Sequence, residues 1–70
     1  MASTIGIVGL GLIGSSLGLA LSHADSQLRI IGCDIDPEVE TTALEMGCIG
    51  ERGSLPEAAA AADILFLCVP

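Results

Sequence analysis

The sequence has very little positive charge and almost no aromatic side chains. Its 70 residues include two basic residues against nine acidic ones, one histidine, one phenylalanine, and neither tryptophan nor tyrosine. A net charge of −7 argues against a nucleic-acid partner, because binding to a phosphate backbone depends on clustered lysine and arginine. With 51% hydrophobic residues and a single aromatic one, the core must be aliphatic, as in parallel sheets covered on both faces.

Charged side chains are also missing from the first 22 residues, which raises the alternative of a membrane segment or a signal peptide. We disfavour this alternative, because a signal peptide starts with basic residues and the first basic residue here is Arg29. Five glycines in the same stretch would also weaken a single long helix. We therefore expect no membrane association and divide the stretch into a strand followed by a helix.

The sequence also lacks the usual metal-binding and disulfide patterns. The cysteines Cys33, Cys48 and Cys68 show no Cys-x-x-Cys spacing, and the single histidine leaves no clustered ligand set. We interpret the cysteines as core residues in a reducing, cytoplasmic compartment, rather than as metal ligands or reactive thiols. His23 falls at the expected end of the first helix, where an imidazole interacts favourably with the helix dipole, and it receives no catalytic role.

What the chain does contain is a glycine motif that directly follows a strand pattern. The short apolar run 4–8 leads into Gly9, Gly11 and Gly14, a G-x-G-x-x-G arrangement, and residues 12–23 can then form a helix. This order opens a dinucleotide-binding βαβ unit. In such a unit the first glycine makes a tight turn, the second lets the backbone approach a pyrophosphate, and the third lets helix and strand pack closely.

The candidate cofactor site extends beyond the glycines. The backbone amides of Leu12 and Ile13 at the helix start are expected to hold the phosphates, since basic side chains are scarce. A second apolar run, 28–33, ends at Asp34, 20 residues after the third glycine, where an acid binds the ribose hydroxyls. That carboxylate would repel a 2′-phosphate, so we predict NAD rather than NADP as the cofactor. The plainer alternative is that Asp34 is a turn or capping acid.

The following segment predicts two further helices. Asp36 and Pro37 are typical of a helix start, and Gly47 is typical of a helix end. The S-x-x-E spacing at 54–57 predicts a capping box in front of an alanine-rich helix. Between the two helices, the apolar pair 48–49 is either a clipped third strand or a passing loop.

The last apolar run, 64–69, is typical of a central parallel strand. Right-handed crossovers then give a Rossmann-type, doubly wound α/β sheet with strand order 3-2-1-4. A ligand at the switch point would contact the glycine turn together with Val69 and Pro70. Because an apolar strand at a sheet edge favours aggregation, we infer truncation. Residues 1–70 are then the N-terminal part of a dinucleotide-binding domain, without the substrate-binding and catalytic domain.

The glycine run and its surroundings resemble the prephenate and arogenate dehydrogenase family of tyrosine and aromatic amino acid biosynthesis. The likeness covers the family's glycine signature, second strand, second-helix end and fourth strand, at 9–17, 31–34, 43–47 and 62–70. It implies an NAD-linked oxidoreductase that oxidises a cyclohexadienyl acid, prephenate or arogenate, with loss of carbon dioxide and hydride transfer to NAD. It also implies a catalytic histidine and substrate-binding residues later in the family's chain, so no catalytic residue is named here.

Two other hypotheses stay open. Hydroxyisobutyrate-, phosphogluconate- and 2-hydroxyacid-type dehydrogenases share the strand, the glycine turn and the acid. The Ser-Ser-Leu that follows the third glycine favours the prephenate type instead. A non-catalytic module that senses NAD would require the same loop. For the full-length protein we expect a small-molecule substrate and a homodimer.

Overall fold

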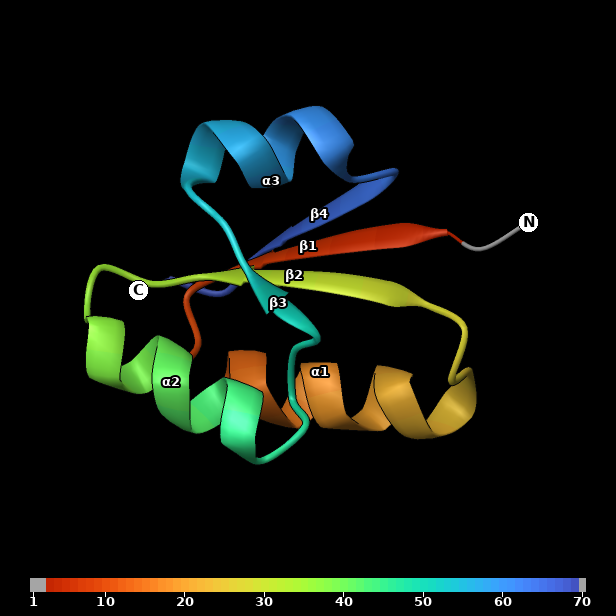
Figure 1. Ribbon diagram of the computed structural model, residues 1–70, viewed down its shortest axis with the longest axis horizontal. Coiled ribbons are helices and arrows are strands. Elements are labelled where there is room, and N and C mark those ends of the chain that lie inside the picture. The colour runs from red at the N-terminus through yellow and green to blue at the C-terminus, as the bar shows by residue number, and fades with distance from the viewer. Residues whose placement is uncertain (1–2, 70) are drawn as a thin grey trace.

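The computed structural model describes residues 3–69, which form a four-stranded parallel sheet with helices on both faces (Figure 1). Along the chain the elements are β1 (Thr4–Val8), α1 (Leu12–Ala24), β2 (Arg29–Cys33), α2 (Pro37–Glu45), β3 (Glu51–Arg52), α3 (Leu55–Ala61) and β4 (Ile64–Leu67). The strand order is β3-β2-β1-β4, and every pairing is parallel. In Figure 1, α3 covers one face of the sheet, and α1 and α2 cover the other. The predicted Rossmann-type fold with order 3-2-1-4 is confirmed.

Local sequence signals explain the ends of α2 and α3. The carboxylate of Asp36 accepts a hydrogen bond from the Glu38 N–H, and Gly47 follows the helix with a φ of 77° that favours glycine. Before α3, Ser54 and Glu57 form the predicted capping box, in which each side chain accepts a hydrogen bond from the other's backbone N–H.

The core lies around β1 and β2 and is aliphatic, as the composition predicts. Ile7 in β1 is fully buried. The other buried members of this cluster are Ile5, Leu10, Ile30, Ala43, Cys48 and Ile49. Cys48 and Ile49 therefore form a buried loop, and the third strand comes two residues later and pairs with β2. Gly18 of α1 lies so close to this loop that a Cβ there would clash with the Cys48 carbonyl oxygen.

The fourth strand differs from the prediction. β4 lies beside β1 as expected, but it ends at Leu67 rather than at residue 69 and forms one edge of the sheet. Ile64 and Leu67 are exposed, at 53% and 66%, whereas Phe66 is half-buried and packs against the core. The predicted order already places β4 at an edge, so the correction concerns burial: β4 lacks the cover typical of a central strand, because no other strand within residues 3–69 pairs with its outer side. An apolar strand at a sheet edge is what the sequence also led us to expect.

No helix in the described part of the chain combines the length and the apolar character needed to cross a bilayer. Likewise, no three His, Cys, Asp or Glu side chains within residues 3–69 lie together as a metal ion would require.

Candidate functional site

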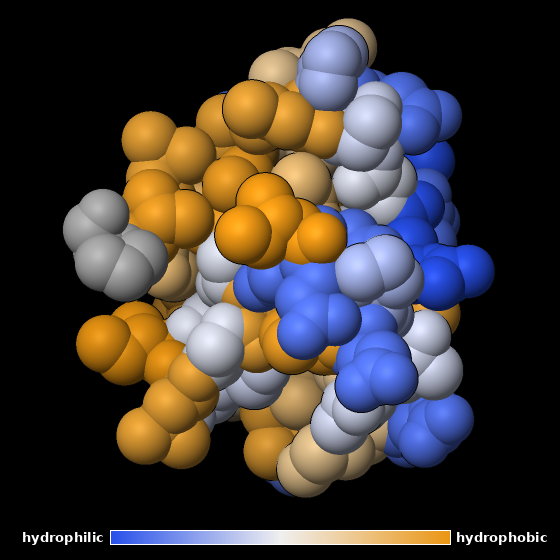
Figure 2. All heavy atoms as spheres, turned by 90° about the vertical axis from the view of Figure 1, so that its left-hand side faces the viewer, coloured by the Kyte–Doolittle hydropathy of each residue, from blue (hydrophilic) through white to orange (hydrophobic). Residues whose placement is uncertain are grey.

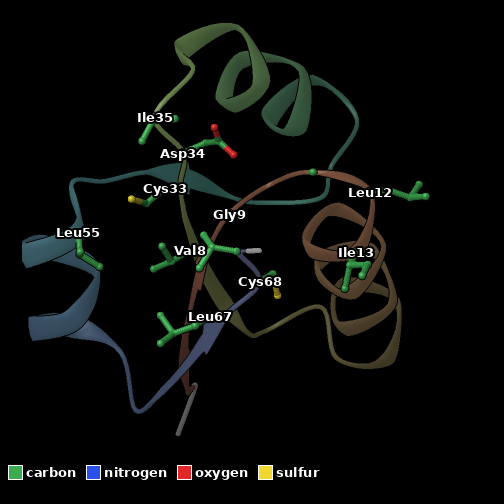
Figure 3. Close-up of a pocket in the computed structure, with 12 residues that line it drawn as sticks. Val8, Gly9, Leu12, Ile13, Cys33, Asp34, Ile35, Leu55, Leu67 and Cys68 are labelled. Carbon is green, nitrogen blue, oxygen red and sulfur yellow. The ribbon is translucent and has the colours of Figure 1, made fainter.

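A pocket of about 1010 Å³ opens where the parallel strands end, at the face shown in Figure 2. That face is largely hydrophobic, with hydrophilic side chains gathered along one side of it. Four segments line the pocket: the end of β1 with the glycine turn, the end of β2 with the next turn, the start of α3, and the end of β4 (Figure 3). The lining residues are Val8, Gly9, Gly11, Leu12, Ile13, Cys33, Asp34, Ile35, Leu55, Leu67, Cys68 and Val69.

Most of the predicted site residues meet at this pocket. Gly14 is the exception within residues 3–69, because it is buried beneath the turn. Pro70 lies outside the described residues. The predicted residues that line the pocket are Gly9, Gly11, Leu12, Ile13, Asp34 and Val69. Their role in binding a cofactor stays a prediction.

The three glycines of the motif differ in what the fold requires of them. Gly9 has a φ of 93°, and a Cβ there would lie 2.7 Å from the Cys68 carbonyl oxygen. A Cβ on Gly14 would clash with the Gly9 carbonyl oxygen, so this glycine allows α1 to pack on the turn. Gly11 has a φ of −68°, and a Cβ there would meet no atom within 4 Å. The fold therefore explains Gly9 and Gly14, whereas the absent side chain of Gly11 leaves space in the pocket.

The N-terminus of α1 has no side-chain cap. Gly11 occupies the N-cap position and makes no side-chain hydrogen bond, whereas α2 and α3 are capped by Asp36 and Ser54. The first N–H groups of a helix lack partners within it and carry a partial positive charge. At the pocket these groups belong to Leu12 and Ile13, two residues that are 86% and 75% exposed. This arrangement can hold an anion through the backbone alone.

Asp34 follows β2 directly and lies across from the glycine turn (Figure 3). One carboxylate oxygen accepts a hydrogen bond from the Asp36 N–H at 3.0 Å, and the other accepts one from the Leu10 N–H at 2.8 Å. These two backbone hydrogen bonds, that from Asp36 foremost, lower the pKa of Asp34 below its ordinary value. Asp34 is therefore a carboxylate at neutral pH. By accepting these backbone hydrogen bonds, Asp34 acts as a turn acid, which was the plainer alternative in the sequence analysis. It also lines the pocket.

Two side chains that hold this site together were missed in the sequence. The Ser15 hydroxyl donates to the Leu10 carbonyl oxygen at 2.8 Å, so the backbone of Leu10 is held by Asp34 at its N–H and by Ser15 at its carbonyl. Glu40, in the first turns of α2, accepts a hydrogen bond from the Asp34 N–H at 3.0 Å. Ser15 directly follows the last glycine of the motif, and Glu40 lies near a helix start. These positions were the only signals in the sequence, and a position of this kind does not specify which backbone group the side chain contacts. Ser16, which matches the resembled family, is exposed.

The cysteines need a correction. Cys48 is buried as predicted, but Cys33 and Cys68 are half-buried and line the pocket. They are less covered than expected because both lie where the strands end and the pocket opens. Burial raises the pKa of the Cys33 thiol, and the negative charges of Glu40 and Asp34 raise it further. The thiol is therefore protonated and a poor nucleophile, which agrees with a wall residue.

Comparisons with known proteins agree with this geometry. A family model described as NADP oxidoreductase, coenzyme F420-dependent, matches residues 4–70. The prephenate dehydrogenase of Lactococcus lactis subsp. cremoris (strain MG1363) is 44% identical over 64 residues, which cover 91% of this chain and 18% of that protein.

Two solved structures of dehydrogenases have a similar fold. Synechocystis arogenate dehydrogenase has a TM-score of 0.85 with 36% identity, and the match covers 96% of this chain and 23% of that one. Mycobacterium tuberculosis 3-hydroxyisobutyrate dehydrogenase has a TM-score of 0.84 with 31% identity, covering 100% of this chain and 23% of that one. The chain thus spans about a fifth of the length of these relatives. The resemblance to prephenate and arogenate dehydrogenases is confirmed, as is a nicotinamide cofactor as the class of ligand.

Proposed function

The chain belongs to the family described as NADP oxidoreductase, coenzyme F420-dependent, and from this membership we propose that it is the cofactor-binding part of an NAD-linked dehydrogenase of the prephenate or arogenate type. One observation carries the proposal. The uncapped start of α1, the open space at Gly11 and the carboxylate of Asp34 all meet at a single pocket. Together they offer separate positions for a diphosphate and a ribose.

Each part of the pocket suits one part of a dinucleotide. The N–H groups of Leu12 and Ile13 would hold the diphosphate, and Gly11 would let it approach the backbone. Asp34 would accept hydrogen bonds from the ribose hydroxyls. The apolar side chains of Ile35 and Leu55, which also line the pocket, offer a surface for the adenine (Figure 3).

The preference for NAD is argued from charge. The family's description names NADP, whose 2′-phosphate would lie beside the Asp34 carboxylate. Neither arginine of the chain lines the pocket, and Arg29, at the start of β2, pairs with Glu51 at 2.7 Å. No described cation is therefore placed to offset the repulsion between a 2′-phosphate and Asp34.

When bound, NAD would supply the hydride acceptor of the proposed reaction, and Leu12, Ile13 and Asp34 would hold it at the pocket. Residues of this chain bind and orient the cofactor, and we assign them no proton transfer. The residues that would act on substrate are proposed to lie elsewhere in the protein, because no catalytic side chain can be assigned in this pocket. The substrate proposal, prephenate or arogenate, rests on what the relatives are named for.

A second candidate is a 3-hydroxyisobutyrate-type dehydrogenase, which the match to the Mycobacterium tuberculosis enzyme over the whole chain favours. The experiment that separates the two is an assay of NADH formation by the intact polypeptide that carries these residues. Prephenate, arogenate and 3-hydroxyisobutyrate would be supplied in turn. We expect turnover with prephenate or arogenate. Turnover with 3-hydroxyisobutyrate alone would overturn the substrate assignment, and NAD binding without any turnover would favour a sensing module.

A further inference from the structure

Between β2 and α2, backbone N–H groups of the turn donate hydrogen bonds to acidic side chains of the same turn and of the start of α2. The N–H of Asp34 donates to Glu40 at 3.0 Å, that of Asp36 to Asp34 at 3.0 Å, and that of Glu38 to Asp36 at 2.9 Å. Free backbone N–H groups in turns and at helix starts are what commonly bind phosphate. In this turn three such groups already have a carboxylate as their partner.

Glu40 carries its charge close to the pocket. It lies in the first turns of α2 and is half-buried, with its carboxylate on the backbone of Asp34. The negative charges of Glu40 and Asp34 both raise the pKa of Cys33, a residue of the pocket wall. The negative charge of Glu40 therefore acts on groups in the pocket wall, close to the Asp34 carboxylate that would bind the ribose.

We propose that Glu40 is a second specificity-determining residue, which disfavours NADP by its charge and by occupying the Asp34 N–H. The inference rests on the proposed function, because it concerns the ribose end of the same cofactor site. It places the choice of cofactor in the whole turn rather than in Asp34 alone. Replacing Asp34 by itself would then leave two obstacles to a 2′-phosphate, the Glu40 charge and the occupied N–H.

The size of the effect follows from Coulomb's law. A 2′-phosphate carries between one and two negative charges at neutral pH, and removal of one nearby charge across several ångströms of solvent changes its affinity about three- to tenfold. NAD lacks this phosphate, so its affinity should change by less than about twofold. Salt screens such interactions, so the difference should shrink as the ionic strength rises.

The test is a titration of the chain and its E40Q variant with NAD and with NADP, by isothermal calorimetry at low and high salt. Glutamine keeps an oxygen that can accept the Asp34 hydrogen bond while removing the charge. E38Q is the matched control, because it makes the same charge change at an exposed position in the same helix start. Circular dichroism of each variant would establish that the fold is retained.

We expect E40Q to improve the NADP-to-NAD affinity ratio about three- to tenfold at low salt, and E38Q to change it less. The double variant D34N/E40Q should bind NADP more tightly than D34N. Equal effects of E40Q on both cofactors, insensitive to salt, would show a merely structural role and overturn the inference. If the unmodified chain binds NAD and E40Q leaves the ratio unchanged, the inference alone fails. If the folded chain binds neither cofactor, the proposed function fails first.

Discussion

Gly11→Val is expected to separate cofactor binding from folding. A Cβ at Gly11 meets no atom within 4 Å, and the backbone there has an ordinary φ of −68°. Loss of glycine from an N-cap position costs about 0.5–1 kcal/mol, and a similar amount is regained because valine restricts the unfolded chain. The free energy of unfolding should therefore change by less than about 1 kcal/mol.

Binding should respond very differently, because the valine side chain would occupy the approach to the start of α1. Two charge-assisted hydrogen bonds from the Leu12 and Ile13 N–H groups to a diphosphate are worth about 1.5–3 kcal/mol each. Their loss would weaken NAD binding by roughly 10² to 10⁴-fold. Calorimetric titration with NAD and urea unfolding of the same samples would measure both quantities.

Two variants in the same region serve as controls for the effect of Gly11→Val. Gly14→Ala should unfold the chain, because its Cβ would clash with the Gly9 carbonyl oxygen. Ser16→Ala, at an exposed position of the same helix, should change neither folding nor binding. If Gly11→Val binds NAD as tightly as the unmodified chain, or unfolds as Gly14→Ala should, the assignment of Gly11 to the cofactor is wrong.

Three further predictions follow from the same contacts. The pKa of Asp34 is lowered in the folded chain, so its contribution to stability is present above the ordinary aspartate pKa and is lost as the pH falls through the lowered value. Urea unfolding as a function of pH should show this acid-side loss, and Asp34→Asn should remove it. An unchanged acid side in the variant would count against the role of Asp34. Ser15→Ala removes the hydrogen bond to Leu10 and should lower the free energy of unfolding by about 1 kcal/mol in urea titrations. A cost equal to that of Ser16→Ala would contradict this. The exposed β4 edge should make the chain self-associate in light scattering, and Leu67→Lys should reduce the association, whereas a monomeric unmodified chain would contradict this.

The elements around β1 could be predicted because their signals are local. The apolar run, the glycine spacing and the helix that follows are contiguous in sequence, and β1 was found at the predicted residues, 4–8. The strand order follows from the right-handed crossover rule, which needs the number of strands and no side-chain detail. The pocket-lining residues of the glycine motif and Asp34 could also be predicted, because the motif and its spacing from the acid are local features of the sequence.

The third and fourth strands show what the sequence could not decide. The apolar pair 48–49 was a candidate for the third strand because of its apolar character. Those two side chains instead lie in the core, and the polar pair Glu51–Arg52 forms the strand that pairs with β2. There the ion pair between Glu51 and Arg29 joins the two strands. The run 64–69 is apolar enough for a central strand, but burial depends on a neighbouring element that a pattern of residues does not specify.

Ser15 and Glu40 were missed for a different reason. Both act through backbone atoms, the Leu10 carbonyl and the Asp34 N–H, and the distance to such partners is set by the folded turn. A serine or glutamate near a helix start is otherwise common and carries no ligand signal. The motif thus identified the groups that would face the cofactor. The structure was needed to find Ser15 and Glu40, the side chains that hold the backbone of those groups in place.

The most direct test of the central claim is an NMR titration of the isotope-labelled chain with NAD and, separately, with NADP. The amide signals to follow are those of Gly11, Leu12, Ile13 and Asp34. We expect these four signals to shift with NAD and to shift much less with NADP at the same concentration. If they stay unchanged with NAD in a folded sample, the glycine turn and Asp34 do not form a cofactor site in this chain.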